Sequence, residues 1–373
     1  MARYAHITGW GMSVPPQVLT NEDLSRMVDT TDEWIQSRTG IRERHIASPR
    51  ETTATLAADA AAKALVVAGL PARRIGLIIV ATSLPEHYFP STACIVQDQL
   101  GAGDAAAFDI LAACSGFVYA LSTASQMIIS GAYDSALVIG SETLSRLIDW
   151  NDRATCVLFG DGAGAVVLQA SDRPGGLLSF SLHADGSGGD SLIVPAGGSR
   201  MPASLETIED NKHTIVMDGR GVYRFATRVI EASVREVVAK AGLTLPDIRL
   251  IVPHQANRRI IESAAKDLEL PMERFVVNVD RYGNTSSASV PIALCEAVAD
   301  GRIRAGDNIV LVAFGAGLTW GSAVVQWVST SVRRGRKLPW GDRLLARARS
   351  AARRTRRRIE GIIWGKNIEI GWL

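Results

Sequence analysis

Short, nearly continuous apolar runs rich in β-branched residues recur along this chain, and they predict strands that are buried on both faces. These runs cover residues 75–81, 135–140, 163–169, 250–253, 308–313 and 322–328. The stretches between them carry apolar residues at helical spacing, at 53–68, 116–130, 222–241 and 258–268. This alternation predicts an α/β fold with helices packed on both sides of largely parallel sheets.

A constant offset of 173 residues relates several of these segments. Ala-Gly-Leu at 68–70 recurs at 241–243, and an apolar run follows both copies. The same offset carries Cys114 onto Ser287. We therefore predict two homologous halves, residues 1–171 and 172–330, because two unrelated α/β domains would not share one offset.

The net charge of +2 conceals a separate basic segment at residues 331–373. This segment has 13 Lys and Arg against 3 Asp and Glu, whereas the other 330 residues have 27 against 35. Its apolar residues fall at helical spacing, with arginines on the remaining face and three tryptophans around them. The pattern favours an amphipathic helix that contacts an anionic membrane surface or an acidic partner, with a solvated tail as the alternative. The rest of the chain gives no support for nucleic-acid binding.

Composition restricts the compartment. The four cysteines form no CxxC pair and have no metal-ligand spacing, which indicates reduced thiols and no metal site. The N-terminal residues lack the apolar core of a signal peptide, and no apolar run approaches the ~20 residues of a membrane span. We expect a soluble cytoplasmic protein.

Three motifs far apart in the chain carry candidate chemistry. Cys114 lies in Ala-Ala-Cys-Ser-Gly-Phe, His254 in Pro-His-Gln-Ala-Asn and Asn284 in Gly-Asn-Thr-Ser-Ser-Ala-Ser. The position of Cys114 before a predicted helix should lower its thiol pKa and favour the thiolate. His254 follows an apolar strand, at the sheet edge where α/β proteins place functional groups. Each residue alone is more typical of a structural position, so the combination matters.

In these motifs the chain resembles the β-ketoacyl-acyl-carrier-protein synthase III family of the thiolase superfamily, over residues 1 to about 328. The resemblance implies the thiolase fold, five layers (αβαβα) built from two duplicated halves. It also implies that Cys114, His254 and Asn284 are the catalytic Cys-His-Asn triad.

The implied reaction is a decarboxylative Claisen condensation that needs no cofactor. Cys114 takes an acyl group from acyl-coenzyme A, and malonyl-acyl-carrier protein (malonyl-ACP) is then decarboxylated to an enolate that attacks the acyl-cysteine, giving β-ketoacyl-ACP. His254 and Asn284 would stabilise the enolate oxygen as neutral hydrogen-bond donors. Backbone N–H groups of Cys114 and Ala316 would stabilise the second oxyanion. Ala316 interrupts the glycine run that the family commonly has there.

The resemblance further assigns binding residues. The coenzyme A site would comprise Thr30, Trp34, Arg38, Arg153, Gly219 and Asn257, with the adenine between Trp34 and Arg153. The carrier protein would contact a basic patch of Arg224, Arg258, Arg259 and Lys266. Phe89 and Phe314 would border the acyl pocket, with Phe89 reaching the pocket of the other subunit in a homodimer.

Other functions remain open from the sequence. They are an acyltransferase that transfers the Cys114-bound acyl group without chain extension, a type III polyketide synthase, and an inactive partner subunit of a condensing complex. Asn284 beside His254 favours condensation, because simple acyl transfer has no enolate to stabilise. The acyl primer, and whether the product enters fatty acids or a specialised metabolite, also stay open.

Overall fold

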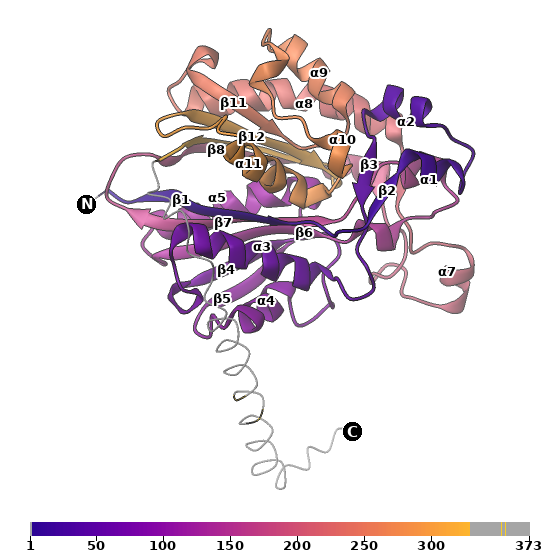
Figure 1. Cartoon of the computed structure of the whole chain (residues 1–373), viewed down its shortest axis with the longest axis horizontal. Coiled ribbons are helices and arrows are strands. Elements are labelled where there is room, and N and C mark those ends of the chain that lie inside the picture. The colour runs from indigo at the N-terminus through magenta and orange to yellow at the C-terminus, as the bar shows by residue number, and fades with distance from the viewer. Residues whose placement is uncertain (1, 329–351, 353–354, 356–373) are drawn as a thin grey trace.

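The computed structural model describes residues 2–328, 352 and 355. The basic helix predicted within residues 331–373 therefore lies outside the described residues, apart from two isolated positions. Two larger sheets organise the described part of the chain (Figure 1). Within the described residues, none of the helices combines the length and apolarity that crossing a membrane needs.

The first sheet has five strands in the order β1-β7-β6-β4-β5. Their bounds are β1 (Tyr4–Ser13), β7 (Gly162–Ser171), β6 (Ser135–Glu142), β4 (Leu77–Ala81) and β5 (Ala106–Ile110). The second sheet has the order β11-β12-β13-β8, with β11 (Ile248–Pro253), β12 (Asn308–Gly315), β13 (Thr319–Gln326) and β8 (Gly176–Ala184). Two small ribbons pair β2 (Val18–Thr20) with β3 (Glu43–His45) and β9 (Leu192–Ile193) with β10 (Val216–Met217). The division of the chain into halves at residue 171 stays a prediction.

Helices cover both sheets and fill the space between them (Figure 1). The central layer consists of α5 (Gly116–Ile129) and α11 (Ser289–Ala299), which share one apolar core with both sheets. The outer face of the first sheet packs against α3 (Thr53–Ala68) and α4 (Thr92–Leu100). The outer face of the second sheet packs against α8 (Gly219–Lys240) and α9 (Arg258–Asp267). The predicted α/β class and five αβαβα layers are confirmed.

The shorter helices are α1 (Asn21–Ser25), α2 (Asp32–Thr39), α6 (Arg153–Cys156), α7 (Leu205–Glu209) and α10 (Val279–Tyr282). Helix ends follow local chemistry. Thr52 caps the N-terminus of α3, and Gly69 ends that helix at a left-handed φ of 63°. Asp218 caps α8 by accepting hydrogen bonds from the backbone N–H groups of Arg220 and Gly221.

The prediction of largely parallel sheets is wrong, because both sheets are mixed. β4 runs parallel to β5 and β6, and β11 runs parallel to β12, but the remaining neighbours in the two sheets are antiparallel. Only residues 316–318 connect β12 to β13, and so short a loop permits only an antiparallel pair.

Candidate active site

Cys114 lies in the single turn η2 (Ala113–Ser115) that leads directly into α5. Ala113 before it has a φ of 45°, a left-handed conformation that is unusual for a residue other than glycine. The Cys114 side chain is buried, with 6% of its surface exposed. The sequence therefore places the thiol at the N-terminus of the central helix, as predicted.

The end of β12 and the start of β13 pack tightly against this turn. A Cβ atom on Gly315 would lie only 2.6 Å from the Cys114 backbone nitrogen, so the approach requires glycine. Thr319 Oγ1 lies 3.0 Å from the carbonyl oxygens of both Ala112 and Ala316. These contacts hold Ala316, the predicted second source of a backbone N–H, on the loop that abuts Cys114.

His254 follows the last residue of β11 and is buried. Its Nδ1 lies 2.6 Å from Ser289 Oγ at the start of α11, and the backbone N–H of Gln255 donates to the same hydroxyl at 3.3 Å. The ring of Phe314 meets the imidazole edge to face, with centroids 5.1 Å apart. Burial lowers the pKa of His254 to about 3, so the ring is neutral at physiological pH.

Asn284 is held by the turn that follows it. Its Oδ1 accepts a hydrogen bond from the backbone N–H of Ser286 at 2.9 Å, and its own backbone N–H donates to the Leu158 carbonyl at 2.8 Å. The bond to Oδ1 fixes the orientation of the amide and leaves Nδ2 as the donor on its other side.

One short segment, residues 284–289, connects the three candidate residues. Ser286 hydrogen-bonds to the Cys114 side chain and orients Asn284, while Ser289 contacts His254. The turn η7 (Ser286–Ala288) also packs against η2. The structure thus brings Cys114, His254 and Asn284 into one hydrogen-bonded region, although their motifs lie up to 170 residues apart in the sequence.

The predicted lowering of the Cys114 pKa is wrong in the structure. Burial raises the pKa of the thiol to about 12, and the nearby Glu142 carboxyl raises it further, while the Ser286 hydrogen bond acts in the opposite direction. Desolvation disfavours a thiolate more than the helix terminus favours it, so Cys114 rests as a thiol.

Sequence reasoning missed three residues of this region: Glu142, Ser286 and Ser289. Glu142 is fully buried at the end of β6, where it accepts hydrogen bonds from Ser83 and Ser286. A glutamate that ends an otherwise apolar strand was the available signal, because an acidic residue is rarely buried without a partner. The two serines gave no such signal, since a Ser-rich run after Gly-Asn is typical of a loop.

In the predicted coenzyme A site, the two sides of the adenine clamp contact each other. The Arg153 guanidinium lies over the Trp34 ring, 4.9 Å from its centroid, and its Nη1 donates to the Asp29 carbonyl at 2.8 Å. Arg153 therefore covers the indole face on which a base would stack. Thr30 is buried beside α2, and its hydroxyl has no hydrogen-bond partner among the described residues.

Asn257 joins two helices of the same region. Its Oδ1 accepts from the backbone N–H of Arg259 and caps α9, and its Nδ2 donates to the Arg38 carbonyl at 3.0 Å. Arg38 is exposed near the end of α2. At Gly219, the first residue of α8, an added Cβ would approach no neighbour closer than 3.7 Å.

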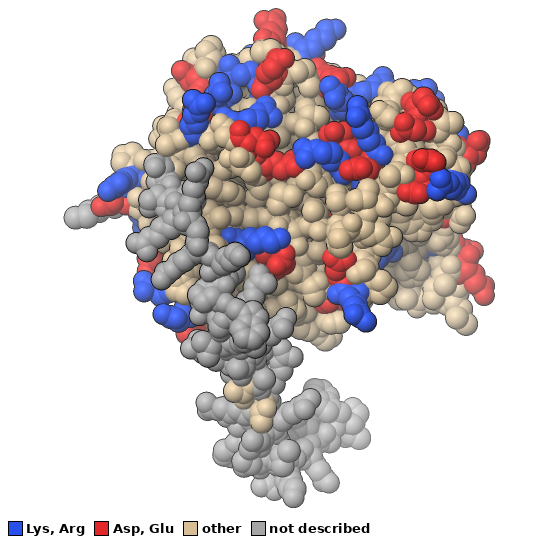
Figure 2. Space-filling model, in the orientation of Figure 1, with Lys and Arg blue, Asp and Glu red and all other residues tan. Residues whose placement is uncertain are grey.

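The four residues of the predicted carrier-protein patch are exposed on α8 and α9, which pack side by side. They are Arg224, Arg258, Arg259 and Lys266. Arg258 forms an ion pair with Glu262 at 2.8 Å, and Arg259 lies over the ring of Tyr223. Acidic and basic side chains are interspersed on this part of the molecule (Figure 2). The patch is therefore less purely basic than the four residues alone suggest.

The two predicted acyl-pocket residues differ in their exposure to solvent. Phe314 is buried against His254, whereas Phe89 is 87% exposed beside Tyr88, which is also exposed. The structure does not bring Phe89 to the site of its own chain.

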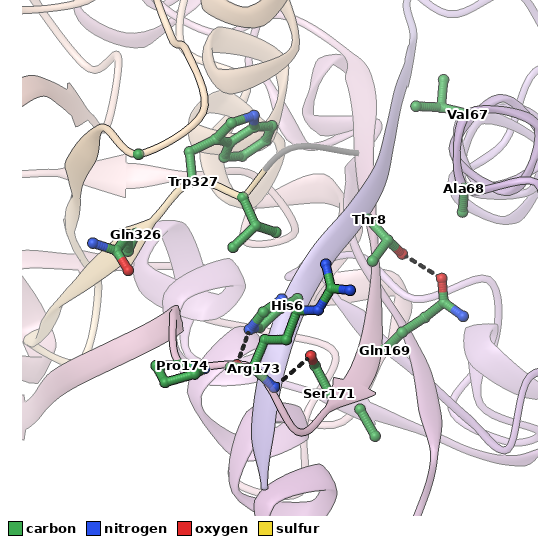
Figure 3. A pocket seen from close by; sticks show the side chains of 13 residues that line it. His6, Thr8, Val67, Ala68, Gln169, Ser171, Arg173, Pro174, Gln326 and Trp327 are labelled. Atoms are coloured by element: carbon green, nitrogen blue, oxygen red, sulfur yellow. Dashed lines mark hydrogen bonds between the residues drawn. The ribbon is translucent and has the colours of Figure 1, made fainter. Parts of the chain in front are cut away.

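A cavity of about 670 Å³ lies elsewhere, between the end of β13 and the strands β1 and β7 (Figure 3). Its lining includes His6, Arg173 and Trp327, and it reaches Val328. None of the predicted site residues lines it. Within the described residues, no group of three or more His, Cys, Asp or Glu side chains could hold a metal ion.

Comparisons with known proteins match most of the chain. A family model described as 3-oxoacyl-[acyl-carrier-protein (ACP)] synthase III matches residues 108–186, and its C-terminal counterpart matches residues 238–327. The chain is 56% identical over 329 residues to β-ketoacyl-[acyl-carrier-protein] synthase III of Roseiflexus sp. (strain RS-1), covering 88% of this chain and 100% of the relative.

Solved structures show the same architecture. A 3-oxoacyl-[acyl-carrier-protein] synthase III from Aquifex aeolicus VF5 superposes with a TM-score of 0.81 at 47% identity, covering 87% of this chain and 100% of that one. The priming β-ketosynthase of the R1128 polyketide pathway superposes with a TM-score of 0.82 at 36% identity, covering 88% and 98%. The thiolase fold is therefore confirmed, and the chain belongs to the β-ketoacyl-acyl-carrier-protein synthase III family.

Proposed function

We propose that this protein catalyses the decarboxylative condensation of an acyl-coenzyme A with malonyl-ACP through an acyl-Cys114 intermediate, giving β-ketoacyl-ACP. The observation that carries the assignment is the segment 284–289, which links the thiol, a neutral imidazole and an oriented carboxamide. Membership of the synthase III family supports the same reaction.

In the first half-reaction, the Cys114 sulfur attacks the thioester carbonyl carbon. Negative charge then develops on the carbonyl oxygen, and the backbone N–H groups of Cys114 and Ala316 stabilise it. Collapse of the tetrahedral intermediate releases coenzyme A and leaves the acyl group on Cys114.

In the second half-reaction, malonyl-ACP loses carbon dioxide and forms an enolate. His254 Nε2 and Asn284 Nδ2 donate hydrogen bonds to the enolate oxygen. Ser289 can donate to His254 Nδ1, and the proton of the neutral ring then resides on Nε2, as this role requires. The enolate carbon attacks the acyl-cysteine carbonyl, and the Cys114 sulfur leaves.

The substrates would bind around α2, α8 and α9. Thr30, Trp34, Arg38, Arg153, Gly219 and Asn257 would bind coenzyme A, while Arg224, Arg258, Arg259 and Lys266 would contact the carrier protein. The unpartnered hydroxyl of Thr30 supports a polar ligand beside α2. The reaction uses no cofactor. We also propose a homodimer in which the exposed Phe89 borders the partner's acyl pocket, and a cytoplasmic location.

Acyl transfer without chain extension is the second candidate. It would use Cys114 in the same way but would leave Asn284 without a function. The hydrogen bond that orients the Asn284 amide therefore favours condensation.

The test is intact-protein mass spectrometry after incubation with a panel of acyl-coenzyme A donors and then with malonyl-ACP. We expect a mass gain that Cys114→Ala abolishes, followed by discharge as β-ketoacyl-ACP with release of carbon dioxide. Acylation without decarboxylation would contradict the condensing function and support acyl transfer without chain extension. Absence of acylation from every donor would support the inactive partner subunit.

A further inference from the structure

Glu142 is a buried acid that the proposed steps leave without a role. It ends β6 beside the two turns, and none of its side chain is exposed. Its carboxyl accepts hydrogen bonds from the Ser83 backbone N–H, at 3.0 and 3.1 Å, and from Thr82 Oγ1 at 3.2 Å. An acid that serves only packing is rarely so completely enclosed, because burying it costs free energy.

A hydroxyl connects Glu142 to the nucleophile. Ser286 Oγ donates to Glu142 Oε1 at 3.1 Å, and the same hydroxyl lowers the pKa of the Cys114 thiol, whose turn η2 packs against η7. Because its own hydrogen points to the carboxyl, the Ser286 oxygen can accept the thiol hydrogen. The three side chains thus form a continuous path from sulfur to carboxyl.

We infer that Glu142, acting through Ser286, accepts the proton of the Cys114 thiol while the sulfur attacks an acyl thioester. The S–H bond breaks as the bond between sulfur and the acyl carbon forms. Ser286 takes the thiol proton and passes its own to the Glu142 carboxylate. The bond from the acyl carbon to the coenzyme A sulfur then breaks, and the proton returns from Glu142 to the departing thiolate.

The environment of Glu142 suits a proton acceptor. Its neighbours from the described residues are Thr82 and Ser83 after β4, Ser286 and Ser287 of η7, and the coupled thiol of Cys114 in η2, and none of these is a cation. Burial raises the pKa of Glu142 above the ordinary value for glutamate, while the surrounding hydroxyl and N–H donors lower it in part. A carboxylate with a raised pKa takes up a proton more readily than an exposed one.

The inference rests on the proposed function only for the identity of the thioester, so we test it with two reagents. One is an acyl-coenzyme A that acylates the wild-type protein, and the other is iodoacetamide, which alkylates a thiol in any fold. For both, we would measure the rate of Cys114 modification between pH 5 and pH 10 by quenching, digestion and mass spectrometry of the Cys114 peptide, because the exposed Cys94 also reacts with iodoacetamide.

For the wild type we expect a rate that rises with the ionisation of Glu142 and levels off before increasing again at alkaline pH. Glu142→Gln should remove the first rise and slow modification at pH 7 by about 10²-fold. Glu142→Asp should restore part of the rate together with the inflection. Ser286→Ala should reproduce the Glu142→Gln profile, and the double variant should be no slower than either single variant, as expected of one shared path.

Asp161→Asn is the matched control. Asp161 is also a buried acid with a raised pKa, but it accepts hydrogen bonds from Ser145 and Ala47 instead. This variant should lower the melting temperature and keep the inflection. If Glu142→Gln does not fold, Ser286→Ala decides the test.

A Glu142→Gln or Ser286→Ala protein with the wild-type profile for both reagents would overturn the relay. A wild-type protein that shows the inflection with iodoacetamide but accepts no acyl group would instead overturn the proposed function and leave the relay intact.

Discussion

Two turns in the centre of the molecule have the same backbone but present different side chains. Residues 113–115 and 286–288 each form a single turn that leads into a central helix, and Ala113 and Ser286 have matching φ angles of 45° and 48°. In the first turn the central residue, Cys114, lies at the candidate site. In the second, its counterpart Ser287 is fully buried and donates to the Ala81 carbonyl at 2.9 Å.

The residues around Ser287 carry the chemistry of the second turn. Asn284 precedes it, Ser286 contacts Cys114, and Ser289 contacts His254. One backbone shape thus supplies a nucleophile on one side of the site and the groups that orient its partners on the other. If this comparison is correct, the first turn supplies the nucleophile for acylation. The second turn orients the groups for decarboxylation and contributes to acylation only through Ser286.

Cys114→Ala should have the largest effect. Removing the sulfur leaves no atom to hold the acyl group, so condensation should fall by several orders of magnitude. Intact-mass spectrometry should then detect no acyl adduct from any donor that acylates the wild type. An adduct of unchanged size would show that the nucleophile is a residue outside the first turn.

Asn284→Ala should separate the two half-reactions. Loss of one oxyanion donor typically costs about 10²–10³ in rate, so carbon dioxide release from malonyl-ACP should slow by that factor. Acylation of Cys114 should persist, because the role proposed for Asn284 is to stabilise the enolate. Equal slowing of both half-reactions would contradict the division of labour between the turns.

His254 links the second turn to a pH effect on stability. The pKa of His254 is about 3 in the folded protein and 6.5 in the reference state. Between these two pH values, the imidazole is therefore protonated in the unfolded chain but neutral in the folded protein. The free energy of unfolding should therefore decrease as the pH falls from 6.5 towards 3, by at most about 1.4 kcal/mol per pH unit. Urea titrations of the wild type and His254→Gln should show a smaller decrease in the variant. Parallel profiles would mean that the imidazole is not buried in solution.

Ser287→Ala should have the smallest effect and offers the sharpest contrast with Cys114→Ala. It removes the hydrogen bond to Ala81, which should lower the free energy of unfolding by about 1 kcal/mol. Cys114 should still accept an acyl group in this variant. Complete loss of the adduct in a folded Ser287→Ala protein would show that the second turn carries more of the first half-reaction than its contacts indicate.

The sequence predicted the layers better than the strand directions. Apolar runs and helical spacing indicated many of the elements, since local patterns record burial. The direction of β13 depends on the three-residue loop before it, which an apolar run cannot reveal. The edge strands β1, β5 and β8 escaped prediction as well, because their burial patterns are mixed.

The candidate site shows a similar limit. Its motifs identified Cys114, His254 and Asn284, but the direction of the Cys114 pKa shift was wrong, because burial of a side chain depends on the whole fold. Glu142, Ser286 and Ser289 could not be assigned to the site from the sequence, because they reach it only when β6, η7 and α11 pack together in the fold.

The Arg153 guanidinium lies on the face of Trp34 where the proposed coenzyme A site would stack a base. A base that stacks on this indole must first displace the guanidinium from the ring and from Asp29. The apparent dissociation constant then equals the intrinsic one divided by the fraction of molecules in which the ring is uncovered. In the proposed coenzyme A site, the same competition would assist departure of the nucleotide, since the returning guanidinium would take its place on the ring. Weaker binding would thus accompany faster release.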